Sequence, residues 1–301
     1  MSNNNVYQMV TDRIMAQLEK GIIPWRKPWT GVGVEDGGAI NYVTRRPYSM
    51  LNQMLLGREG EYLTFNQVKE RGGNIKKGAK SSVVVFFATT TYKKRERENE
   101  NGETETIRVE EERLYPILRY YNVFHIDDCE GIESKIKPDE KPEPKLSPIE
   151  SAEKVINDYV KREESLTFRN NKPSGQAYYS PLSDMVCVPM LSQYDIAEEY
   201  YSTTFHELTH STMTEKRCNR KQEKISAFGS EEYSREELVA EIGSAMLCHS
   251  VAIDCDKAFK NSVAYIQGWL RKLKNDNKMI VWASSRAEKA TRYILGESSA
   301  E

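Results

Sequence analysis

Apolar residues recur at helical spacing near the start of the chain, where a helix is predicted over residues 6–20 and Gly21 ends it. The apolar face of this helix consists of Val6, Met9, Val10, Ile14 and Leu18. Shorter helices are predicted over 48–56 and 62–71, the second capped by Thr64. Runs rich in β-branched and aromatic residues predict strands at 82–88 and 114–126. The first half of the chain should therefore combine helices with a β-sheet.

Two segments lack this apolar pattern. Residues 93–113 are dense in Lys, Arg and Glu, which predicts a hairpin tip or a loop between two strands. Residues 133–148 contain four prolines among charged residues, the composition of a linker. We therefore predict a first domain over 1–132, a linker over 133–147 and a second domain over 148–301.

The second half begins with a helix start signal, since Ser147, Pro148 and Glu150 form a capping box with proline at the first helical position. Strands near 176–179 and 185–188 are followed by two helices, the first capped by Asp195 and the second by Ser234, and by helical segments over 257–273 and 282–295. The predicted fold class is α+β, with an N-terminal mixed α/β domain and a C-terminal, mainly helical domain that contains a small sheet. The strand at 185–188 is either a plain core strand or one that pairs with an extended peptide substrate.

The helix after Asp195 contains the motif HELTH at residues 206–210. Histidines four residues apart lie on one helical face, so His206 and His210 can bind one metal ion. Between them, Glu207 is placed to accept a proton during hydrolysis. The helix after Ser234 offers Glu237 and Glu241 on one stripe, of which we predict Glu237 as the third ligand and Glu241 as the carboxylate behind a histidine, the reverse assignment being the alternative. The ligand types favour Zn²⁺, and Mn²⁺ or Co²⁺ also suit them.

Composition and charge limit the classes of protein to which this chain can belong. Hydrophobic residues make up 39% and charged residues 29% of the 301 residues, and no apolar run is long enough to span a membrane. The N-terminus lacks the pattern of a signal peptide, and the five cysteines are never spaced C-x-x-C, so we expect a cytoplasmic protein with reduced thiols. The net charge is −2, but residues 1–92 contain twelve Lys or Arg and seven Asp or Glu, an excess of five positive charges.

Aromatic and basic residues are interleaved in this basic segment. Flat rings stack on unpaired bases and cations follow the phosphates, a mixture that suits single-stranded DNA better than duplex. The alternative is that the aromatics belong to the core and the cations to the solvated surface. The candidate DNA contacts are Trp25, Arg26, Lys27, Trp29, Tyr42, Arg46, Tyr48, Asn52, Phe65, Lys76, Lys77 and Lys80.

The order of these motifs resembles the ArdC-type antirestriction proteins of conjugative plasmids and related mobile elements. Over residues 6–132 and 148–295 the resemblance rests on GIIPWRKPW at 21–29, LTFNQ at 63–67, YNVF at 121–124, HELTH at 206–210 and EELVAE at 236–241. It implies an N-terminal domain that binds single-stranded DNA, a C-terminal zincin-like metallopeptidase domain, and a role in protecting incoming DNA from host restriction.

Three functions remain open at this point. The chain is a DNA-binding antirestriction protein with a zinc metallopeptidase-like site, or a metallopeptidase that acts on a protein target and uses its N-terminal domain only for recruitment. The third alternative is a non-enzymatic DNA-binding module with a structural metal.

Overall fold

A computed structural model describes residues 3–26, 38–98, 104–136, 147–220, 231–254 and 263–297. The N-terminal half contains α1 (Asn3–Leu18), η1 (Pro24–Arg26), β1 (Ala39–Asn41), α2 (Met50–Leu56), β2 (Gly60–Thr64), α3 (Phe65–Glu70), β3 (Asn74–Ile75), β4 (Ser82–Glu98), β5 (Thr104–His125), η2 (Ile126–Asp128) and β6 (Cys129–Glu130). The C-terminal half contains α4 (Pro148–Arg162), β7 (Thr167–Arg169), β8 (Tyr178–Ser180), β9 (Met185–Cys187), η3 (Leu191–Gln193), α5 (Ala197–Ser211), α6 (Glu231–Ser250), α8 (Val263–Asn275) and α9 (Met279–Leu295). The mixed α+β fold class is confirmed.

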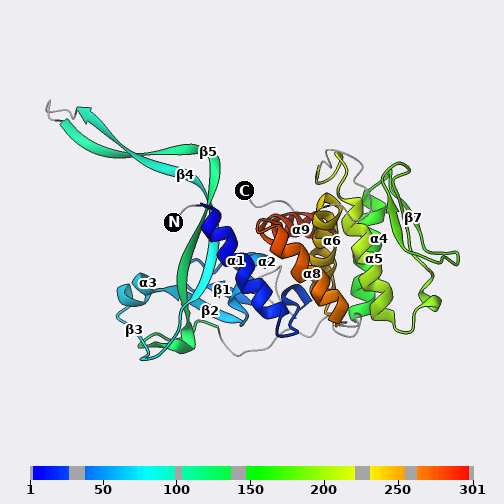
Figure 1. Cartoon of the computed structure of the whole chain (residues 1–301), viewed down its shortest axis with the longest axis horizontal. Coiled ribbons are helices and arrows are strands. Elements are labelled where there is room, and N and C mark those ends of the chain that lie inside the picture. The colour runs from blue at the N-terminus through cyan, green and yellow to red at the C-terminus, as the bar shows by residue number, and fades with distance from the viewer. Residues whose placement is uncertain are drawn as a thin grey trace.

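A four-stranded sheet organises the N-terminal half. Its strand order is β1-β2-β5-β4, with β1 parallel to β2 and the other pairs antiparallel. Strands β4 and β5 continue together far beyond the sheet as a long two-stranded arm (Figure 1). The prediction of a loop or hairpin tip over 93–113 was therefore too broad, because backbone pairing continues from Ser82↔Val123 to Glu98↔Thr104. In such an antiparallel ladder every second pair exchanges its backbone N–H and C=O groups, which offsets the polar composition.

The prediction of a helix over 62–71 was wrong in its first part. Tyr62 and Leu63 lie in β2, and the helix begins only at Phe65. Thr64 does cap it, since the Gln67 backbone N–H donates to the Thr64 hydroxyl at 3.3 Å and the Gln67 side chain accepts from the Thr64 N–H at 2.9 Å. Tyr62 and Leu63 are buried in the sheet, and this packing favours a strand at these positions although a helical pattern follows them.

Two side chains of helix α2 form hydrogen bonds with backbone groups of β1 and β4, the two edge strands of the sheet. Asn52 donates to the Val85 carbonyl at 2.9 Å and accepts from the Val85 N–H at 2.7 Å. The neighbouring Gln53 binds the N–H and the carbonyl of Ala39 in the same way, at 2.8 and 2.9 Å. Unpaired edge groups would otherwise invite pairing with another chain. Asn52 is 1% exposed, so its role here is in the interior.

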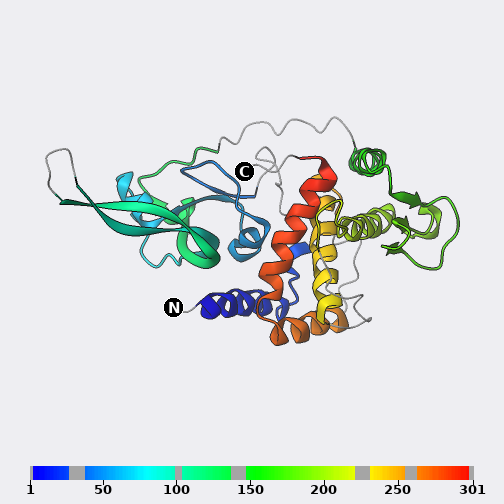
Figure 2. The ribbon, with the colours of Figure 1, turned by 90° about the horizontal axis from the view of Figure 1, so that it is seen from above.

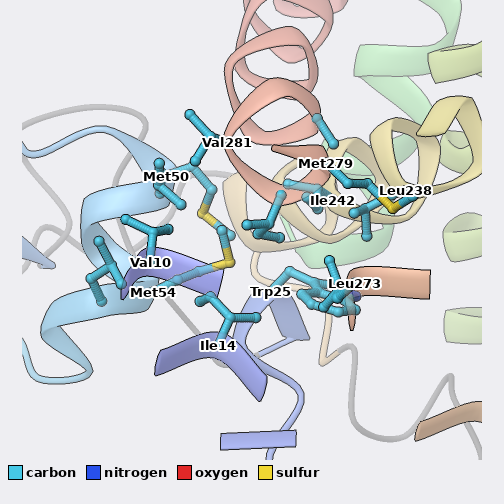
Figure 3. Packing of buried hydrophobic residues seen from close by; sticks show 14 of the residues in the cluster. Val10, Ile14, Trp25, Met50, Met54, Leu238, Ile242, Leu273, Met279 and Val281 are labelled. Atoms are coloured by element: carbon cyan, nitrogen blue, oxygen red, sulfur yellow. The ribbon is translucent and has the colours of Figure 1, made fainter. Parts of the chain in front are cut away.

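The N-terminal helices share one hydrophobic core with the C-terminal helices (Figure 3). From the N-terminal half this core receives Val10, Ile14, Trp25, Met50 and Met54, and from the C-terminal half Leu238, Ile242, Leu273, Met279 and Val281. Within this core η1 contacts α6, α1 contacts α8 and α9, and α2 contacts α9. The two regions separated by residues 137–146 in the sequence are joined in space by an apolar interior.

The C-terminal half consists of helices and a small sheet at its far side (Figures 1 and 2). The capping box of α4 is confirmed, with Glu150 N–H donating to the Ser147 hydroxyl at 3.3 Å. The predicted caps of the next two helices were wrong. Helix α5 is preceded by Ile196 with no side-chain cap, and α6 begins at Glu231, before Ser234. None of the helices in the described part of the chain combines the length and hydropathy of a membrane-spanning segment.

Candidate metal centre

Helices α5 and α6 cross closely because a glycine lies at their contact. A Cβ atom added to Gly243 would lie 2.6 Å from Thr209 Cγ2 and 2.8 Å from Thr209 Oγ1. Such distances are far inside van der Waals contact, so only glycine permits this approach. Thr209 is itself fixed by a hydrogen bond from its hydroxyl to the Phe205 carbonyl at 2.8 Å. The side chains that face the gap between the helices are therefore held close together.

Three of these side chains converge on one point. The Nε2 atoms of His206 and His210 are 3.1 Å apart, and the Glu237 carboxylate lies 3.6 Å from the first and 3.5 Å from the second. Ligand atoms about 2.0–2.1 Å from a tetrahedral zinc are separated by about 3.3 Å. The donor set and its spacing therefore fit one divalent ion without rearrangement. All three side chains are intermediate in burial, which leaves the point accessible from the cleft.

Two anionic groups surround His210. Burial acts against the charged imidazole, but Glu236 and Glu237 outweigh it and raise the pKa of His210 to about 10. Burial also opposes the charge of Glu237, but the hydrogen bonds from the two histidines outweigh it and hold the pKa of this carboxyl well below its usual range. Both shifts have one cause, the attraction between these carboxylates and the two imidazoles.

Glu241 does not take part in this cluster, so its prediction as the carboxylate behind a histidine, or as the alternative ligand, was wrong. One turn further along α6, Glu241 accepts a hydrogen bond from the Tyr265 hydroxyl at 2.8 Å and lies 3.7 Å from the Arg26 guanidinium. A turn advances a helix by about 5.4 Å, which carries this carboxylate out of reach. The carboxylate that faces His210 Nδ1, at 3.4 Å, belongs to Glu236.

Glu236 is held by Arg220, a residue that sequence reasoning missed. The Arg220 guanidinium binds both carboxylate oxygens, at 3.0 and 2.7 Å, and also donates to the Thr209 carbonyl at 2.8 Å and to the Thr212 hydroxyl at 2.6 Å. Such a carboxylate fixes the orientation and tautomer of a metal-binding histidine. Glu236 stands directly beside Glu237 in the sequence, but nothing in the local pattern indicates that residue 220 reaches it.

Glu207 lies beside the three ligand candidates. Its side chain is 8% exposed, and burial is the main cause that raises its pKa. The backbone N–H of Tyr179 donates to its carboxylate, which connects α5 to strand β8. A carboxyl with a raised pKa beside the metal position is suited to accepting and returning a proton.

An open cleft of about 380 Å³ leads to these groups. Its walls include Ala177, Tyr178, Tyr179, Pro181 and Met213 in addition to the metal-centre residues. The three-stranded sheet beside it has the order β7-β9-β8. Strand β9 is paired on both sides, so of the two alternatives for 185–188 the plain core strand is confirmed and pairing with a substrate is excluded. Strand β8 is the edge that borders the cleft.

We expect Gly243→Ala to weaken metal binding although no ligand is changed. The added methyl group must push α5 away from α6, which separates the histidines from Glu237. Overpacking of this kind costs about 1–3 kcal/mol of folding stability. Thermal unfolding with and without Zn²⁺ measures both effects. Gly268→Ala on α8 is the control, since a Cβ there meets nothing within 4 Å.

The structure buries five of the candidate DNA contacts. Trp25 is fully buried with its ring 6.0 Å from that of Trp269, and Arg26 is 3% exposed with its guanidinium 4.3 Å from the Tyr265 ring. The buried side chains are Trp25, Arg26, Tyr42, Tyr48 and Asn52. They contribute to the core, so direct stacking on bases was the wrong interpretation for this group.

The remaining candidates are exposed or lie outside the described residues. Phe65 is 51% exposed. Arg46, Lys76, Lys77 and Lys80 are also exposed, whereas Lys27 and Trp29 belong to the part of the chain that is not described. The alternative that the aromatics form the core and the cations the surface therefore holds for most of this segment.

Two known protein families match two successive parts of the chain. Residues 4–124 match the N-terminal domain of the anti-restriction factor ArdC, and residues 157–286 match a zincin-like metallopeptidase. The crystal structure of Mn(II)-bound antirestriction protein ArdC from plasmid R388 is 30% identical, covers 98% of each chain and superposes with a TM-score of 0.69. The chain belongs to the ArdC antirestriction family. The metal-free structure of the R388 protein gives a TM-score of 0.65 over 97% of this chain.

The other relatives of this ArdC-family protein differ greatly from one another in length. Two DNA primases TraC from Escherichia coli are 28% and 25% identical over 96% of the chain, which spans only 27% and 20% of their length. The protein y4eC of Sinorhizobium fredii is 27% identical and is covered over 93% of its length.

Proposed function

We propose that this protein is an antirestriction protein of a mobile element that binds single-stranded DNA and contains a zinc-dependent peptidase site. The observation that carries the proposal is the convergence of His206, His210 and Glu237 at an open cleft, with Glu207 beside them. The membership in the ArdC family and the Mn(II)-bound R388 relative support a divalent ion at these residues.

The two histidines and one carboxylate would hold the ion through two nitrogen atoms and one oxygen, which suits Zn²⁺ and also Mn²⁺ or Co²⁺. When bound, the ion supplies a Lewis acid that polarises a scissile carbonyl. Glu207 takes a proton from the attacking water and passes it to the leaving amine. Glu236 keeps His210 oriented throughout.

A peptide substrate would lie along β8. Tyr178 and Tyr179 border the cleft, and an edge strand offers backbone groups that pair with an extended chain. Ala177, Pro181 and Met213 give the cleft an apolar wall, which favours apolar substrate side chains near the reacting bond.

The cleft argues against a purely structural metal. Structural zinc sites have four protein ligands and are closed, whereas catalytic sites have three and keep one position open. Only three ligand candidates meet among the described residues, and the cleft leads to them. In the alternative function the chain is a metallopeptidase whose N-terminal half serves only for recruitment. It would act on a different target, but the hydrolysis at the metal centre would be the same.

The experiment measures plasmid transfer into a restricting host with wild-type protein and with Glu207→Gln. We expect wild type to increase the survival of incoming DNA and to retard a labelled single-stranded oligonucleotide at low salt, where charge contacts are strongest. Survival without oligonucleotide binding would contradict the DNA-binding part of the proposal. Full protection by Glu207→Gln would show that hydrolysis is not the mechanism of protection.

A further inference from the structure

One face of the four-stranded sheet exposes a pair of aromatic rings. Phe86 on β4 and Tyr121 on β5 are each 46% exposed. Their ring centroids are 5.9 Å apart at an interplanar angle of 67°. Large aromatic side chains are normally buried, so an adjacent exposed pair indicates a surface that receives a ligand.

The strand register places an arginine beside the two rings. Phe86 pairs with Arg119, and Val84, two residues before Phe86, pairs with Tyr121, two residues after Arg119. Paired residues and residues two apart share a face, so Phe86, Arg119 and Tyr121 lie together. The Arg119 side chain is exposed. We call Phe86, Arg119 and Tyr121 the sheet platform.

Buried aromatic residues support the platform from one side. The Tyr48 ring lies 6.3 Å from the Phe86 ring and 6.3 Å from the Tyr62 ring. Tyr48 is 6% exposed, and its backbone carbonyl accepts from Gln53 at 3.1 Å. The buried Tyr48 ring therefore restricts the movement of the Phe86 side chain, which reduces the conformational entropy lost when a ligand binds.

The charge on this face favours a polyanion. By strand alternation the exposed charged residue on this face is Arg119, and β1, β2, β4 and β5 place no carboxylate on it among their described side chains. Glu61 lies on the opposite face and is fully buried, where Arg45, Ser134 and Lys135 bind it. A negatively charged ligand at Phe86 and Tyr121 thus meets no repelling carboxylate from these strands. Asp127 lies beside His125, with its carboxylate 3.5 Å from the His125 Nδ1 atom.

We propose that the sheet platform stacks unpaired bases of a single-stranded nucleic acid, with Arg119 beside the phosphates. This proposal rests on the proposed single-stranded DNA binding and assigns it to residues different from those predicted from sequence. Every base presents a flat face to such rings, so the platform would bind without strong sequence preference. A duplex buries those faces, which excludes it as the occupant.

The chain offers a closely matched control. Phe87 follows Phe86 directly, is also 46% exposed and pairs with Leu118. Leu118 belongs to the core beneath the opposite face of the sheet. Phe86→Ala and Phe87→Ala therefore remove the same side chain at equal exposure from opposite faces.

The experiment measures the anisotropy of a fluorescein-labelled oligothymidine of about 15 nucleotides, which spans the usual site size. Full-length wild type, Phe86→Ala, Tyr121→Ala, Phe87→Ala and Arg119→Ala are titrated at several salt concentrations. We expect Phe86→Ala and Tyr121→Ala each to weaken binding about tenfold, as for one lost stacked base. Phe87→Ala should bind like wild type, and Arg119→Ala should reduce the slope of log affinity against log salt by about 1.

The outcomes separate this proposal from the one on which it rests. If wild type binds the oligonucleotide and both Phe86→Ala and Tyr121→Ala bind equally well, the platform is wrong and DNA binding lies elsewhere. If wild type does not bind, the proposed function and the platform both fail. If the two variants bind normally but change the molar mass measured by light scattering, the face is a contact between copies of this chain and the proposal is overturned.

Discussion

Glu207→Gln should abolish peptide hydrolysis and leave metal binding intact. Glutamine has nearly the same size and keeps a hydrogen-bond acceptor, but it cannot take up a proton. The loss of a general base costs about 10²–10⁴-fold in rate. The rate is measured on a mixture of quenched fluorescent peptides with the zinc-loaded protein, and zinc content by elemental analysis of the same samples.

Glu199→Gln is the control for this experiment. It lies on the same helix two turns before Glu207 and is not part of the cluster of ligand candidates. We expect the control to cleave at the wild-type rate. Cleavage by Glu207→Gln at that rate would show that another group moves the proton. Absence of any cleavage by wild type would contradict a peptidase function.

Glu237→Gln should lower the affinity for zinc by at least about 100-fold, since removal even of a carboxylate behind a ligand costs about 10–100-fold. An amide oxygen is a poor substitute for a carboxylate at a site that also loses one negative charge. Zinc affinity is measured by competition with a chromophoric chelator of known affinity.

Glu241→Gln provides the comparison on the same helix. Glu241 binds Tyr265 and lies near Arg26, away from the two histidines. This variant should keep the wild-type zinc affinity, although its thermal stability falls when the buried contacts are weakened. The opposite result, with zinc lost in Glu241→Gln and kept in Glu237→Gln, would reverse the assignment of the third ligand.

The sequence predicted the histidine pair because its geometry is local. Any helix through residues 206–210 places the two imidazoles on one face. The third ligand depends on how α6 lies against α5, and Glu237 and Glu241 share one stripe of that helix. The position of Gly243 against Thr209 decides between them, and this long-range contact leaves no periodic signal.

The N-terminal half was harder to predict. A tryptophan followed by an arginine looks the same in the sequence whether the two side chains contact a nucleic acid or lie in the core. Trp25 and Arg26 are buried because α8 brings Trp269 and Tyr265 against them, from a segment more than 200 residues away in the sequence. Conversely, Phe86 is exposed in a run whose pattern resembles any core strand.

The shared core has a consequence for the domain organisation. The two family models match residues 4–124 and 157–286, and the predicted linker lies in the interval between them. In the structure, η1 packs on α6, the helix that contains Glu237, while α1 packs on α8 and α9 and α2 packs on α9. Helix α6 therefore receives part of its support from the N-terminal half, through η1.

The central claim is that His206, His210 and Glu237 together hold one divalent ion. The most direct measurement is a zinc-soaked crystal structure with anomalous scattering recorded on both sides of the zinc edge. We predict one strong peak per chain, about 2.0–2.2 Å from His206 Nε2, His210 Nε2 and a Glu237 oxygen. A structure with fully zinc-loaded protein and no peak between these three side chains would contradict the account.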